Sequence, residues 1–135
     1  MTEEQESTQQ PRDIQHLLFE RAERLKELAA INQTTDILKE GKPLDDTLQQ
    51  LAQLFPSAWQ YPEYTVCCIS FAGKEYKSPG FTRSSWLQRQ SFDVIDGRTG
   101  YIDIYYLKDF IQFDEGPFLK EERHLIINLA SAIKN

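Results

Sequence analysis

The stretch YTVCCISFAGKEYKS, residues 64–78, decides the fold class of this chain. Its first part, Tyr64 to Ala72, reads as a strand with apolar side chains on both faces. Val66 and Cys68 lie on one face, and Cys67, Ile69 and Phe71 lie on the other. Such a pattern is typical of a central strand with both faces covered. Ala72-Gly73-Lys74 then predicts a tight hairpin turn into a short second strand, Glu75 to Ser78.

A second hairpin is indicated further along the chain. Residues Trp86–Ile95 and Gly100–Leu107 have the composition of strands, and the sequence DGRT at residues 96–99 is a strong turn signal between them. A polar connection, Pro79–Ser85, links the two hairpins. Since hairpins pair antiparallel strands, we expect one antiparallel sheet of about four to five strands.

Helical patterns flank the predicted strands on both sides. Apolar residues recur with helical spacing from Asp13 to Glu40, and a second helix is expected from Pro43 to Phe55. The last helix, within residues 114–135, is expected to begin at Pro117, because proline is favoured at the first helical position. Helices outside consecutive hairpins predict an α+β fold, in which N- and C-terminal helices flank an antiparallel sheet.

The length and composition indicate one domain. Residues 1–12 contain no aliphatic residue beyond Met1 and are expected to be disordered, so residues 13–135 are expected to form the single domain. The acidic start differs from a secretory signal, and the longest uncharged apolar run, Val66 to Ala72, is too short to span a bilayer. The net charge of −6, without a basic cluster, argues against a nucleic-acid partner. We therefore expect no membrane insertion. We also expect a cytoplasmic location, since the only two cysteines are adjacent and cannot form a disulfide without strain.

The long first helix carries a stripe with the alternating spacing of three and four that is typical of a coiled coil. The stripe consists of Leu18, Arg21, Leu25, Leu28, Asn32 and Thr35. A second stripe, Ala22, Ala29 and Ile31, indicates a second contact. The pattern predicts a homodimer through the terminal helices, with Leu18, Leu25, Leu28 and Asn32 in the interface. The alternative is one amphipathic helix that lies on its own domain.

The last helix also has a wide apolar surface. Leu125 and Leu129 are expected to pack on the domain, whereas Ile126 and Ile133 lie near a second stripe and are predicted dimer-interface residues. No stop signal follows Lys134, so we expect this helix to lead into a further segment.

The titratable and nucleophilic residues form no recognisable catalytic arrangement. His16 and His124 lie singly on helices, and none of the HxH, HxxxH, CxxC or HExxH spacings of metal sites occurs. Cys67 and Cys68 lie in an apolar strand without the positive charge that activates a thiol, so we expect buried structural cysteines. We therefore expect no enzymatic activity, no metal and no cofactor.

Four residues are weak candidates for a small-molecule pocket: Trp59, Cys67, Trp86 and Phe92. With Tyr61, the aromatic members could line a cavity, although packing between helices and sheet is the more frequent role of such residues. The sequence leaves these two alternatives open.

Three stretches together resemble a GAF-like (GAF/PAS-type) sensor domain of bacterial signalling proteins, as found upstream of histidine-kinase cores. They are PSAWQYPEYTVCCISFAGKEYKSPGF at residues 56–81, VIDGRTGYIDIYYL at residues 94–107, and DEGPFLKEERHLIINLASAIK at residues 114–134. The resemblance implies a GAF/PAS-like fold, a cytoplasmic sensor role and parallel dimerisation through the flanking helices. Where GAF domains that hold cyclic nucleotides or tetrapyrroles usually have a helical pocket lid, this chain has only Pro79–Ser85.

These observations predict a non-catalytic signal-transduction and dimerisation domain, with a kinase core or a partner protein following it. The alternative is a stand-alone protein–protein interaction module with no ligand and no output domain.

Overall fold

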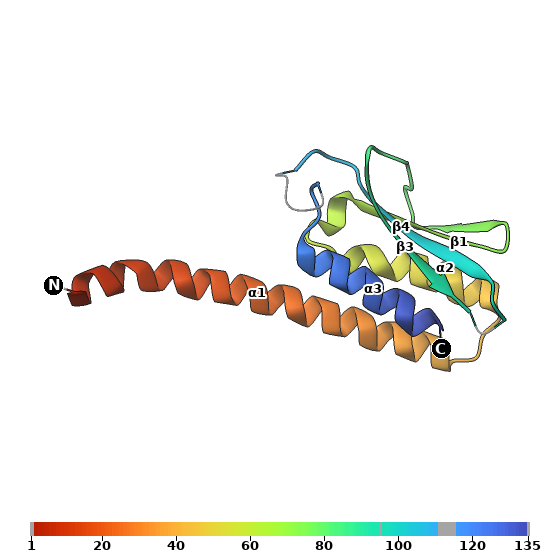
Figure 1. The fold of residues 1–135 in the computed structure, drawn as a ribbon, viewed down its shortest axis with the longest axis horizontal. Helices are drawn as coiled ribbons and strands as arrows, with labels where there is room; N and C mark the ends of the chain where they lie inside the picture. Colours follow the sequence, from red (N-terminus) through yellow and green to blue (C-terminus); the bar gives the residue numbers. More distant parts are fainter. Residues whose placement is uncertain (1, 95, 111–115, 135) are drawn as a thin grey trace.

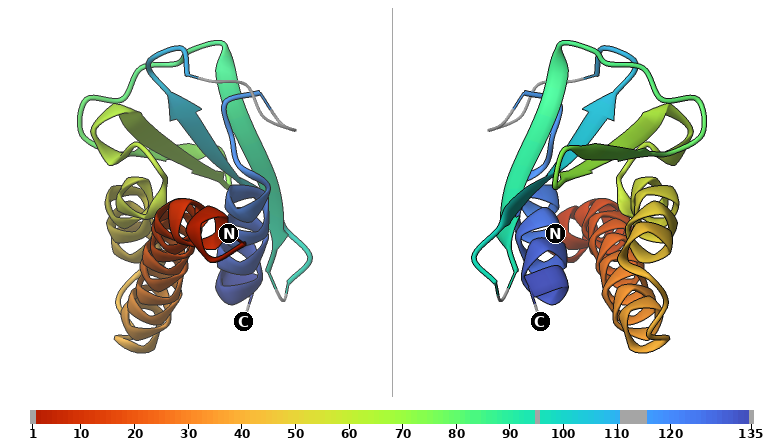
Figure 2. Two further views of the ribbon diagram at one scale, coloured as in Figure 1. Left: turned by 90° about the vertical axis from the view of Figure 1, so that its left-hand side faces the viewer. Right: turned by 90° about the vertical axis from the view of Figure 1, so that its right-hand side faces the viewer.

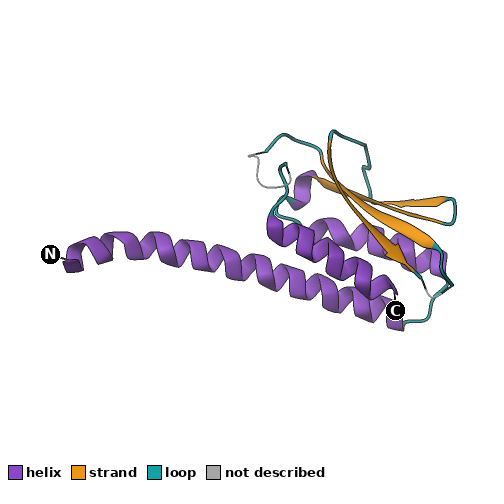
Figure 3. Ribbon diagram, viewed as in Figure 1, coloured by secondary structure: helices purple, strands orange, loops and turns teal. Residues whose placement is uncertain are grey.

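The computed structural model describes residues 2–94, 96–110 and 116–134. Its elements follow one another in the order α1 (Thr2–Lys39), α2 (Leu44–Leu54), the 3-10 turns η1 (Phe55–Ala58) and η2 (Pro62–Tyr64), β1 (Thr65–Phe71), β2 (Lys74–Lys77), β3 (Trp86–Asp93), β4 (Thr99–Tyr106) and α3 (Lys120–Lys134) (Figures 1 and 3). The expected α+β fold, with an antiparallel sheet and flanking N- and C-terminal helices, is confirmed.

The sheet has four strands in the order β2-β1-β4-β3, and every neighbouring pair is antiparallel. Both predicted hairpins are present, and β1 is central as expected. Cys67 of β1 lies opposite Ile104 of β4, which in turn lies opposite Gln88 of β3. This register fixes which side chains share a face, because neighbouring residues of a strand point to opposite sides.

The helices cover one face of the sheet only (Figure 2). Apolar residues of β1 and β4 on this face belong to the hydrophobic core: Cys67, Ile69, Phe71, Ile102, Ile104 and Tyr106. The expectation that both faces of β1 are covered is confirmed by the burial of its side chains, although helices lie over only one of the two faces. On the second face, Val66 and Cys68 are buried as well, and the Glu75 carboxylate, paired with Arg83 from the connection after β2, lies beside the Cys68 thiol.

Helix α1 is much longer than the domain that it contacts, and its first half projects away from it (Figure 1). The helix begins at Thr2, although we expected disorder over residues 1–12. Glutamate and glutamine, which are frequent there, are good helix formers, so composition alone separates a solvated helix poorly from a disordered tail. Gly41, with φ of 68°, follows the end of α1 in the left-handed conformation common after helices.

Helix α3 begins at Lys120, three residues after the predicted start at Pro117. The carboxylate of Glu122 explains this start, because its Oε1 accepts a hydrogen bond of 2.8 Å from the backbone N–H of Leu119. A glutamate at the third helical position that reaches back in this way satisfies a backbone donor at the helix N-terminus.

Candidate functional site

An uncovered apolar stripe runs along α1 from its projecting half into the half that contacts the domain. Leu18, Leu25 and Leu28 are 60%, 58% and 49% exposed, and Ile14 extends the same spacing by one step. Asn32 is exposed as well. The predicted coiled-coil residues thus lie together on one open face of the helix.

The opposite face of α1 contacts the domain. Ala30 and Thr34 are buried there, and the ammonium group of Lys26 donates a 2.9 Å hydrogen bond to the backbone oxygen of Trp59. Because an α-helix has 3.6 residues per turn, Lys26, Ala30 and Thr34 lie on the side of α1 roughly opposite to the leucines of the stripe. The second stripe that we predicted was partly wrong, because Ala22 and Ala29 are exposed. The prediction of two contacting faces on one helix remains consistent with this arrangement.

The predicted interface residues of α3 do not lie on its surface. Ile126 is fully buried and Ile133 is 7% exposed, and both belong to the core of their own domain. They cannot contact a second chain in this fold, so this part of the predicted dimer interface was wrong. The sheet and α1 use the apolar surface of α3 that we had assigned to a second partner.

The four pocket candidates are packing residues. Trp59 and Cys67 are completely buried, Phe92 is 4% exposed, and Trp86 packs against the same core. The indole N–H of Trp59 donates to the Gln88 side-chain oxygen at 3.1 Å. None of the four lines the groove described next. The alternative of core packing therefore accounts for them.

A groove of about 720 Å³ lies where α1 leaves the domain. One wall is α1 between His16 and Glu27, and the opposite wall consists of Ala58, Gln60 and the first turns of α3. Apolar side chains on both walls include the exposed Leu17 and Phe19 and the half-buried Leu119. Five carboxylates and two guanidinium groups complete the lining: Glu20, Glu23, Glu27, Glu121, Glu122, Arg21 and Arg24.

Glu122 is the most deeply buried charged residue of this groove, with 3% of its surface exposed. Its Oε2 accepts hydrogen bonds from the hydroxyl of Tyr106 at 2.6 Å and from the backbone N–H of Gln60 at 2.8 Å, in addition to the α3 contact. Burial raises the pKa of the Glu122 carboxyl, and these hydrogen bonds oppose the shift. Among the described residues, no cation forms an ion pair with it.

The rim of the groove is acidic on both sides. Burial raises the pKa of Glu27 on α1, nearby Glu121 and Glu23 add to the shift, and Arg24 opposes it. Gln60 contributes a further acceptor, since its side-chain oxygen is buried and has no hydrogen-bond partner in the described structure. The groove therefore presents an excess of hydrogen-bond acceptors and negative charge around an apolar surface.

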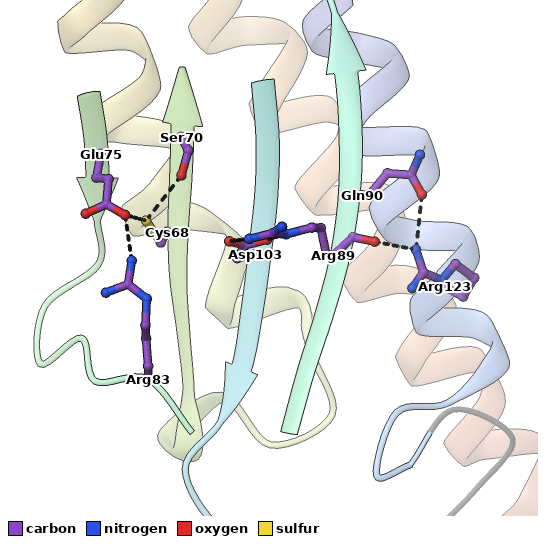
Figure 4. A network of polar contacts seen from close by, with 8 residues as sticks. All are labelled: Cys68, Ser70, Glu75, Arg83, Arg89, Gln90, Asp103 and Arg123. Atoms are coloured by element: carbon purple, nitrogen blue, oxygen red, sulfur yellow. Dashed lines mark hydrogen bonds and ion pairs between the residues drawn. The ribbon is translucent and has the colours of Figure 1, made fainter. Parts of the chain in front are cut away.

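The open face of the sheet carries a polar network (Figure 4). Asp103 is 3% exposed and accepts two hydrogen bonds from Arg89, at 2.6 and 2.9 Å. Arg83 pairs with Glu75 beside Cys68, and burial raises the pKa of the Cys68 thiol. Both cysteines are free and buried, as expected, and neither thiol is activated.

The remaining candidates for chemistry are isolated. His16 pairs with Glu20 at 3.0 Å on the surface of α1, and His124 is exposed on α3. Within residues 2–94, 96–110 and 116–134, no three His, Cys, Asp or Glu side chains are placed to hold a metal ion. The same ranges contain no helix that is long and apolar enough to cross a membrane.

Comparisons of the chain with protein-family models, with curated proteins and with solved structures found no match. Functional inference therefore rests on the exposed stripe of α1 and on the groove.

Proposed function

We propose that this chain is a dimeric, non-catalytic regulatory domain of a cytoplasmic signalling protein, a GAF-like input module of the kind found upstream of histidine-kinase cores. The observation that carries the proposal is the exposed stripe of α1, defined by Leu18, Leu25 and Leu28. Each of these leucines is about half exposed or more, and burying the exposed part against a second helix contributes about 1 kcal/mol per residue.

The spacing and placement of the stripe support a coiled coil between two copies. Its residues alternate in steps of three and four, and its leucines are exposed, whereas Ala30 and Thr34 on the opposite face of α1 are buried. Two copies can therefore align their stripes while each keeps its own domain on the outside. Asn32 supports a fixed register, since a polar residue at a seam position disfavours slipped pairings at some cost in stability.

The dimer is tested with the double variant Leu25→Asp/Leu28→Asp, measured by light scattering. We expect the mass of a monomer, because four carboxylates would meet at the centre of the interface. The matched control is Gln15→Asp/Gln33→Asp, which adds the same charge at two exposed positions of α1 outside the stripe and should remain dimeric. If the leucine variant stays as dimeric as the control, the interface lies elsewhere.

The regulatory role is tested separately, in a fusion of residues 1–135 to a kinase core whose activity depends on helix phase. One residue inserted after Lys134 rotates the connection by about 100°, and seven inserted residues nearly restore it. We expect kinase activity to change with the first insertion and to recover largely with the second. Equal activity in all fusions would favour the stand-alone interaction module.

A further inference from the structure

The coiled-coil stripe leaves one apolar part of α1 unexplained. Phe19 is 45% exposed and lines the groove, on the side of the helix that contacts the domain one heptad later, at Lys26. A second copy paired along the stripe does not reach this side. A partner other than the second copy at the stripe would therefore be needed to cover Phe19.

We propose that this groove binds a basic amphipathic helix of a partner protein. The apolar face of such a helix would cover Phe19, Leu17 and Leu119, and its arginine or lysine side chains would reach the carboxylates of the rim. This mode of recognition is that of a helix in a groove, in which a few spaced anchors supply most of the affinity.

Charge complementarity identifies the partner as basic. Glu27 and Glu121 face each other across the groove, and Glu122 at its base has no cationic partner among the described residues. An ionised carboxylate can accept about four hydrogen bonds, and Glu122 accepts three. Glu122 and the Gln60 oxygen are buried at the base of the groove, whereas the exposed carboxylates of Glu20 and Glu121 are acceptors that a guanidinium or ammonium group of the partner can reach.

The acidic rim and the apolar walls together disfavour two other occupants of the groove. A second copy of this chain carries a net charge of −6 and would be repelled by the acidic rim. A small amine would satisfy the carboxylates but would leave the apolar walls exposed. The stripe and the groove share Arg21, but the three leucines of the stripe do not line the groove, so the inference does not depend on the dimer.

The test uses the full chain and a fluorescently labelled helical peptide with leucines along one face and arginines on both edges of that face. Binding is followed by fluorescence anisotropy, and light scattering on the same samples reports the oligomeric state independently. We expect saturable binding that weakens as salt is added. The same peptide with glutamate in place of arginine should not bind.

Two variants and two matched controls assign the binding to the groove. Phe19→Ala and Glu27→Gln/Glu121→Gln should each weaken binding about fivefold or more. Leu44→Ala removes an apolar side chain of similar exposure outside the groove, and Glu40→Gln/Glu63→Gln removes two carboxylates elsewhere, so both should bind like the wild type. Circular dichroism confirms that each variant is folded.

The proposal is overturned if the basic peptide does not bind, if the acidic peptide binds equally, or if the controls weaken binding as much as the groove variants do. It is also overturned if agmatine, a small cation without an apolar face, binds as tightly as the peptide, because the groove would then be a small-molecule site.

Discussion

Glu122 connects three elements through one carboxylate. It caps the start of α3 at Leu119, accepts a hydrogen bond from the backbone of Gln60 between the two 3-10 turns, and accepts a hydrogen bond from the hydroxyl of Tyr106 on β4. A buried carboxylate without a cation is costly unless hydrogen bonds compensate for its lost hydration. Glu23 on α1 adds a further negative charge nearby and raises the pKa of Glu122 slightly more.

The raised pKa of Glu122 predicts a pH dependence of stability. Since the folded state holds this proton more tightly than the unfolded state, the contribution of Glu122 is greatest below its unfolded pKa, near 4.5, and is lost as the pH rises through the folded pKa. We expect the free energy of unfolding of the wild type, relative to Glu122→Gln, to decrease over that range. Urea denaturation of both proteins at several pH values measures it. A difference that stays constant or increases with pH would contradict a raised pKa.

Asp103 on the open face of the sheet forms an ion pair with Arg89. Removing the guanidinium leaves a carboxylate that is 3% exposed without its counter-charge. Because the Arg89 side chain is itself half exposed, we expect Arg89→Ala to lower the free energy of unfolding by about 2 kcal/mol, less than in a fully buried pair.

Two further variants check this cause by urea denaturation. The double variant Arg89→Ala/Asp103→Ala should lose less stability than the sum of the single variants, because it leaves no unpaired charge. Lys42→Ala breaks an exposed pair with Glu40 and should change stability by less than about 0.5 kcal/mol. Additive effects of the two single variants would show that loss of the ion pair does not cause the destabilisation by Arg89→Ala.

At the scale of elements, the β3–β4 hairpin depends on the contact between Phe92 and Gly100. These residues lie opposite each other, and the Phe92 ring covers the glycine so closely that an added Cβ would overlap it. Phe71 stacks on the same ring at a centroid distance of 5.9 Å. Glycine at position 100 therefore makes room for an aromatic side chain at the end of the sheet.

We expect Gly100→Ala to lower the free energy of unfolding by about 1–3 kcal/mol, as overpacking of a filled core does. In a Phe92→Leu background, Gly100→Ala should lower the free energy of unfolding clearly less, because the ring that would overlap the added methyl group is absent. Thermal or urea denaturation of the four proteins measures this coupling. An equal loss of stability in both backgrounds would show that the effect of Gly100→Ala comes from the backbone of β4 and not from the contact with Phe92.

At the scale of the whole molecule, α1 uses different faces for the domain and for the stripe, and only its second half contacts the domain closely. The domain contacts it between Lys26 and Leu38, whereas the stripe and the groove use residues from Ile14 onward. Folding of the domain and association of the chain are therefore separable in this architecture.

A chain that begins at Ala29, and therefore lacks Leu18, Leu25 and Leu28 of the stripe, tests this separation. We expect it to keep the domain fold, because the buried contacts of Ala30 and Thr34 are retained, and to be monomeric. The midpoint of thermal unfolding of the full chain should rise with protein concentration, whereas that of the shortened chain should not. Loss of the cooperative transition on shortening would show that the projecting half of α1 is needed for folding.

The sequence by itself determined the two hairpins, the flanking helices and the exposed heptad stripe. These features are encoded locally, in alternation along strands, turn residues such as Gly73 and Gly97, and the three-and-four spacing of leucines on one helix. The prediction of buried cysteines held for the same reason, since the residues around them are apolar.

Only the tertiary structure decided which apolar surfaces remain free. Ile126 and Ile133 are indistinguishable in sequence from interface residues, and they are buried because the sheet and α1 both pack on α3. Glu122 could be recognised as a helix-capping residue at most. Its burial depends on Gln60 and Tyr106, which are distant in the chain, and no local pattern records such contacts. The groove likewise exists only because α1 extends past the domain beside the start of α3, and this placement depends on the packing of elements that are far apart in sequence.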